Sequence, residues 1–67
     1  MKLYDLLLIV DPQTNVKVYD AQSFILLAKN KIPAVIREMT QKDMIFNTVH
    51  SMSVNLINEL IVKIYKE

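Results

Sequence analysis

Residues 48–65, TVHSMSVNLINELIVKIY, hold two alternating segments with a short loop between them. In residues 48–56 and again in residues 59–65, every second position forms a set that we expect to face the core. The apolar members of this set are Met52, Val54, Leu60, Val62 and Ile64. A period of two residues is typical of β-strands. The loop at Leu56 to Asn58 would therefore join the two strands in a hairpin.

A second pair of strands is predicted earlier in the chain. Apolar and polar side chains alternate in residues 16–20, and a denser apolar run fills residues 24–29. The intervening residues 20–23 suit a turn, so these segments form the first predicted hairpin. Its core-facing side chains would be Val16, Val18, Phe24 and Leu26.

Two helices are predicted, one before each pair of strands. Leucines recur at helical spacing in residues 2–10, and Asp11-Pro12 ends the pattern because the residue before a proline disfavours helical dihedrals. Pro33 suits a first helical turn, and apolar residues share one face from there to about Asp43. A longer helix through residues 44–46 is the alternative.

The order α-β-β-α-β-β predicts the fold class α+β, with a four-stranded antiparallel sheet from two hairpins and both helices on one face. We expect a single domain over residues 1–67. The chain contains no glycine, so asparagine is expected to supply left-handed backbone dihedrals at the turns. The asparagines that separate apolar segments are Asn15, Asn30, Asn47, Asn55 and Asn58.

The composition is unusually apolar for so short a chain. Hydrophobic residues make up 52% of the 67 positions. A chain near the lower size limit for independent folding has little interior in which to hide them. Part of this apolar surface is therefore expected to contact a second subunit or another protein.

Charge, cysteine content and hydropathy exclude several classes of protein. Eight basic and seven acidic residues give a net charge of +1 without a basic stripe, which disfavours a nucleic-acid binder. The absence of cysteine excludes disulfides and thiolate metal sites. No apolar stretch approaches the roughly 20 residues of a transmembrane helix, and no signal peptide is recognisable. We therefore expect a cytoplasmic protein without membrane association.

Catalytic and cofactor sites are not expected. His50 is the only histidine, and adjacent strand residues such as Ser51 point to the opposite face. The carboxylates are isolated, and Asp11 and Asp20 are best explained as turn residues. A phosphate-binding loop needs glycine. The chain is therefore predicted not to be an enzyme and to bind no metal, cofactor or small-molecule substrate.

A small basic cluster is expected near the start of the second helix, formed by Lys29, Lys31 and Arg37. A solvated edge is its simplest explanation. Contact with nucleic acid is the alternative, and a nucleic-acid-associated accessory protein is accordingly the second functional hypothesis.

The surface that we expect to bind a protein lies on the side of the sheet away from the helices. If the better apolar set of each strand packs under the helices, six further apolar side chains face away from them. They are Tyr19, Ile25, Leu27, Val49, Ile61 and Tyr65. A sheet face in water is mostly polar. This face is therefore expected to be covered by a partner, most simply a second copy in a homodimer.

Several short segments resemble small accessory proteins encoded by phages and prophages of low-GC Gram-positive bacteria. These segments are Lys2 to Leu7, Val10-Asp11-Pro12, Val16 to Asp20, Ile32-Pro33, Val49 to Val54 and Glu59 to Val62. They contain no chemical motif, so the resemblance implies no functional residues. It implies an accessory phage gene product that acts on a host or defence protein.

Overall fold

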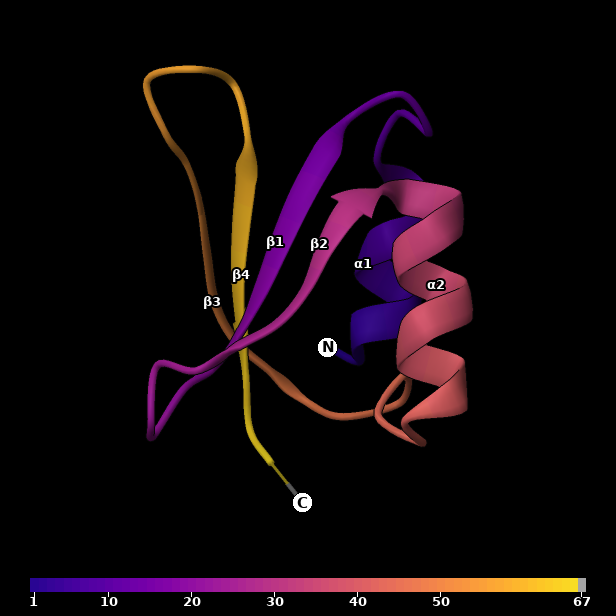
Figure 1. Cartoon of the computed structure of the whole chain (residues 1–67), viewed down its shortest axis with the longest axis vertical. Helices are drawn as coiled ribbons and strands as arrows, with labels where there is room; N and C mark the ends of the chain where they lie inside the picture. The colour runs from indigo at the N-terminus through magenta and orange to yellow at the C-terminus, as the bar shows by residue number, and fades with distance from the viewer. Residues whose placement is uncertain (67) are drawn as a thin grey trace.

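Figure 1 shows a computed structural model of the chain, which describes residues 1–66. The elements follow the predicted order, and each end lies within two residues of its prediction. They are α1 (Leu3–Ile9), β1 (Asn15–Asp20), β2 (Leu26–Lys31), α2 (Ile32–Gln41), β3 (Val49–Val54) and β4 (Leu60–Ile64). Both helices lie on one side of the four-stranded sheet. The predicted α+β fold class is therefore confirmed.

The sheet is mixed, which corrects the prediction of a purely antiparallel sheet. Its strand order is β2-β1-β4-β3. The two hairpins pair antiparallel as expected, but β1 and β4 meet in parallel at the centre. The cause is the crossover through α2. This helix carries the chain back to the end of the sheet where β2 begins, so β3 runs in the same direction as β2. Two hairpins joined by this crossover therefore meet through parallel strands.

Helix α2 ends at a residue with left-handed backbone dihedrals, so the longer helix through residues 44–46 does not form. Asp43 has a φ of 58°, and its N–H donates to the Thr40 carbonyl at 3.1 Å. The N–H of Met44 donates to the Met39 carbonyl at 2.9 Å. These two bonds form a Schellman motif, in which aspartate takes the position usually held by glycine.

The segment after α2 supports the start of α1. The N–H groups of Leu3 and Tyr4 donate to the carbonyl oxygens of Asn47 and Ile45, both at 2.9 Å. The first N–H groups of a helix have no partner within the helix itself. Residues 45–47 supply these partners, which fixes α1 beside the segment leading into β3.

The core lies between the helices and the sheet. Its buried side chains are Leu3, Leu6, Leu7, Val16, Val18, Ala28, Ile32, Val35, Met39, Ile45, Leu60, Val62 and Ile64. Full burial of an aliphatic side chain contributes about 1.5–3 kcal/mol. The positions predicted as core-facing on the two central strands are all among them.

Two β-bulges change which side chains face the helices. The pairing of β1 with β2 skips Leu27, so that Leu26 lies opposite Tyr19. The pairing of β3 with β4 skips His50. An extra residue in one strand moves the side chains beyond it to the other face of the sheet. The bulges therefore decide which residues lie on the side away from the helices.

Three residues of the described chain have a left-handed backbone, namely Phe24, Asp43 and Asn58. Asparagine was expected at such positions, and only Asn58 fits. Asn15 and Asn30 lie within strands instead. Aspartate and even phenylalanine therefore take positions for which glycine is the usual choice.

Helix α1 has 7 residues and α2 has 10. In the described part of the chain, no helix is both long and apolar enough to cross a membrane.

Candidate functional site

We name the side of the sheet that faces away from both helices the outer face. No helix or strand of residues 1–66 covers it (Figure 1). Strand pairing brings three kinds of side chain together there. The apolar ones are Tyr19, Leu26 and Ile61, the lysines are Lys17, Lys29 and Lys63, and the serines are Ser51 and Ser53.

The apolar centre of the outer face crosses β2, β1 and β4. Tyr19 lies opposite Leu26 on one side and next to Lys63 on the other, while Ile61 lies next to Lys17. Leu26 is 46% exposed, and Tyr19 and Ile61 are partly buried. An apolar centre with a charged rim is the usual anatomy of a protein interface.

Phe24 extends this centre from the turn between β1 and β2. Lys63 lies over its ring, with Nζ 5.1 Å from the ring centroid. The residue is 62% exposed, and its backbone φ of 60° costs about 1–2 kcal/mol for a residue other than glycine. A cation–π contact at an exposed site returns only about 0.5–1 kcal/mol. An exposed aromatic side chain held at such a cost is a candidate contact residue.

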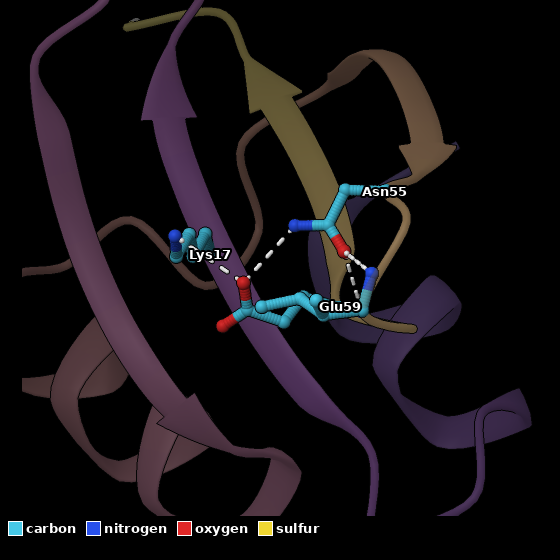
Figure 2. Close-up of polar contacts among 4 residues, drawn as sticks. Lys17, Asn55 and Glu59 are labelled. Carbon is cyan, nitrogen blue, oxygen red and sulfur yellow. Dashed lines mark hydrogen bonds and ion pairs between the residues drawn. The ribbon is translucent and has the colours of Figure 1, made fainter.

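Figure 2 shows the polar network at the β3–β4 turn, centred on Glu59. Its Oε1 lies 3.3 Å from Lys17 Nζ and accepts a hydrogen bond from Asn55 Nδ2 at 3.0 Å. Asn55 Oδ1 accepts the N–H groups of Ile57 and Glu59. The bond from Asn55 and then the ion pair with Lys17 hold the pKa of Glu59 below its usual range, although burial acts in the opposite direction. Glu59 is therefore a carboxylate whose charge is matched by Lys17.

His50 and Tyr65 form an aromatic pair where β3 begins and β4 ends. Their ring centroids are 5.2 Å apart with an interplanar angle of 71°, which is an edge-to-face contact. His50 Nδ1 also lies 3.2 Å from Ser51 Oγ. Both rings are exposed. Tyr65 follows Ile61 and Lys63 at strand spacing, so its ring adds to the aromatic side chains of the outer face.

The outer face contains three of the six contact residues predicted from the sequence. Those on it are Tyr19, Ile61 and Tyr65. Those elsewhere are Ile25, Leu27 and Val49.

The β-bulges explain two of the three misplaced residues. Leu27 is the extra residue of β2 and packs against the core. Val49 lies opposite Ile64 and also packs against the core, because the extra residue His50 reverses the alternation at the start of β3. Ile25 is 62% exposed but lies in the turn before β2.

The prediction that Phe24 and Leu26 pack under the helices is wrong. Residues 24–27 are apolar at every position, so their alternation can be assigned in either register. Met52 and Val54 do face the helix side, opposite buried residues of β4, but they are 56% and 65% exposed. They remain accessible because β3 is an edge strand.

The three residues of the predicted basic cluster do not form one patch. Lys29 lies on the outer face opposite Lys17. Arg37 is exposed on α2, in the helix layer. Lys31 lies two residues beyond Lys29 on the same side of β2, opposite Asn15, and donates to Gln13 Oε1 at 3.2 Å. The outer face therefore takes its positive charge from lysines of β1, β2 and β4 and not from this cluster alone.

Asp11 and Asp20 act as turn residues, as predicted. Each accepts a 2.9 Å hydrogen bond from the N–H two positions later, at Gln13 and Gln22. The bond from Gln22 holds the pKa of Asp20 below its usual range. Residues 1–66 contain no detectable pocket, and no three His, Asp or Glu side chains among them lie close enough together to hold a metal ion.

The resemblance to phage accessory proteins stays a prediction. Because the resemblance implies no functional residues, the candidate residues are identified from the surfaces of the structure. Comparison of the chain with protein-family models, with curated proteins and with solved structures gave no match.

Proposed function

We propose that this chain is a small, non-catalytic protein-interaction module whose outer face binds another protein. The observation that carries the proposal is the apolar centre formed by Tyr19, Phe24, Leu26 and Ile61 on an uncovered sheet face. Burial of such side chains contributes about 1.5–3 kcal/mol each. In this proposal the chain acts in the cytoplasm as a phage or prophage accessory protein, as its sequence resemblance implies.

The charges of the outer face specify the chemistry of the partner. Lys17, Lys29 and Lys63 surround the apolar centre, and the Glu59 carboxylate beside them is paired with Lys17. A complementary partner presents apolar side chains flanked by aspartate or glutamate. The outer face of a second copy would present lysines to lysines. A different, acidic protein therefore fits this face better than the homodimer expected from the sequence.

Single-stranded nucleic acid is the second candidate, because the outer face combines aromatic rings with lysines. Tyr19, Phe24 and Tyr65 offer rings on which unpaired bases could stack. A protein partner is preferred because Lys63 already lies over Phe24 and the net charge is only +1. Tight binding of nucleic acid requires the neutralisation of several phosphates.

A pair of charge reversals on opposite layers tests the proposal. Proteins captured by the tagged chain from its native cells are identified, purified and titrated against the wild type, Lys29→Glu and Arg37→Glu. Both variants change the net charge equally, but only Lys29 lies on the outer face. We expect Lys29→Glu to weaken binding about tenfold and Arg37→Glu to leave it unchanged. Equal effects of the two variants would rule out the outer face as the binding surface.

Fluorescence anisotropy with labelled single-stranded DNA and RNA tests the second candidate. We expect no binding at micromolar protein and physiological salt. Salt-dependent binding that Lys29→Glu weakens would replace the proposed protein partner with nucleic acid.

A further inference from the structure

The two edge strands of the sheet differ in how they are protected. Edge strands of monomeric proteins are usually blocked by lysine, by proline or by a covering segment. β2 carries Lys29 and Lys31, and Lys42 Nζ donates to the carbonyl of Leu27. β3 carries no such charge, since residues 44–58 contain no Lys, Arg, Asp or Glu.

The N-terminal segment covers only the beginning of β3. The N–H of Val49 donates to the Met1 carbonyl at 2.8 Å, and Lys2 forms a bridge with Thr48. Neither contact reaches Met52 or Val54. The second half of β3 is therefore a neutral edge that nothing within residues 1–66 covers.

The backbone of this uncovered half is ready to pair with another strand. The N–H of Asn55 donates to the Glu59 carbonyl at 3.1 Å, so Asn55 and Ser53 direct their backbone groups toward β4. Because direction alternates along a strand, Met52 and Val54 direct theirs outward. Their side chains face the helix side and are more than half exposed. The edge thus offers two N–H groups, two carbonyls and two apolar side chains.

We propose that β3 pairs antiparallel with β3 of a second copy, about a two-fold axis at Ser53. In this register Met52 lies opposite Val54 of the other copy, and Val54 opposite Met52. All outward backbone groups of these residues then have partners. Residues directly opposite each other share a face, so the four apolar side chains meet on the helix side. A symmetric pairing of this kind is compatible with charge only at β3, because β2 would bring its lysines together.

The segment along this edge is rich in exposed apolar side chains. Specific interfaces bury about 800 Å² per partner, which is about one fifth of the 4327 Å² surface of this chain. Residues 52–57 contain four large exposed hydrophobic side chains, of which Leu56 and Ile57 are the most exposed at 102% and 74%. The two-fold pairing places both copies of this segment along the same seam.

The dimer would form one eight-stranded sheet and leave both outer faces open on the same side. The dimer goes beyond the proposed function because it forms through the edge of β3 and not through the outer face. If the chain does not dimerise, the proposed function of the outer face is unaffected. That proposal is tested by the comparison of Lys29→Glu with Arg37→Glu.

Cysteine cross-linking tests both the pairing and its register, because the chain has no cysteine of its own. At the two-fold axis the two copies of Ser53 lie in a pair without hydrogen bonds, with Cα atoms about 4.5 Å apart, within the range of a disulfide. The two copies of Ser51 are four residues out of register, about 13 Å apart along the strand. Ser51 shares the strand and the outer face with Ser53, so Ser51→Cys is a matched control.

We expect Ser53→Cys to form a disulfide-linked dimer under mild oxidation at least about tenfold faster than Ser51→Cys, because a bound copy presents its thiol at high effective concentration. Light scattering of the wild type should give twice the 7.8 kDa mass of one chain. Val54→Pro, which removes an outward N–H and no bond to β4, should give a folded monomer. Equal cross-linking of the two cysteine variants, or a monomeric wild type at high concentration, would overturn the dimer.

Discussion

Glu59 and Lys17 join the β3–β4 turn to β1, with Oε1 and Nζ 3.3 Å apart. Asn55 holds the same carboxylate oxygen and also accepts two N–H groups of the turn. The pair therefore connects the parallel centre of the sheet to the loop beside β3 (Figure 2).

Acid should destabilise the fold through Glu59. Its pKa in the folded chain lies below the ordinary value of 4.5, so the native state favours the charged form. The resulting stabilisation is complete well above pH 4.5 and is lost as the pH falls through the folded-state pKa. Thermal unfolding of the wild type and Glu59→Gln between pH 7 and pH 3 should therefore show a smaller decrease of Tm in the variant. Equal decreases would show that Glu59 has the same pKa in both states. The Tm of the variant should still decrease in acid, because the pKa of Asp20 is also lowered in the folded chain.

Asn55→Ala should destabilise the chain by about 1–2 kcal/mol, because three hydrogen bonds of a partly buried turn are lost. In a domain of this size, that loss lowers Tm by roughly 4–16 °C. Asn30→Ala is the control, since Asn30 is exposed and its Oδ1 accepts the N–H of the next residue, Lys31. A variant at Asn55 that is as stable as the control would contradict the network.

Two substitutions of Phe24 separate its backbone strain from its ring contact. Both Phe24→Gly and Phe24→Ala remove the cation–π contact with Lys63. Only glycine adopts the observed φ of 60° without steric cost. Phe24→Gly should therefore be more stable than Phe24→Ala by about 1 kcal/mol in urea unfolding. Alanine at least as stable as glycine would show that residue 24 is not left-handed. Both variants should weaken partner binding, because both remove the exposed ring.

The elements of the fold could be predicted from the sequence because each strand and helix carries its own hydrophobic period. The central strands were easiest, since Val16, Val18, Leu60, Val62 and Ile64 are buried at strict alternation. The parallel pairing of β1 with β4 was not predictable from these periods. It depends on which strands become neighbours, and that is a property of the crossover through α2 and not of any single segment.

The outer face was only partly predictable because the β-bulges leave no clear signal in an apolar run. Leu26 and Leu27 are the same residue type, yet one lies on the outer face and the other packs against the core. Met52 was predicted to be in the core and is exposed, since alternation shows which face a side chain takes but not whether a helix covers that face.

Photo-crosslinking tests most directly whether the outer face binds a protein: a photo-crosslinking amino acid is placed at position 26 or at position 37 of the tagged chain, in the cells that encode it. Leu26 lies on the outer face and Arg37 in the helix layer, and both positions are exposed. We expect a cross-linked species at position 26 that protease removes and nuclease does not, with no such species at position 37. Cross-links of equal yield at both positions, or a nuclease-sensitive product at position 26, would contradict it.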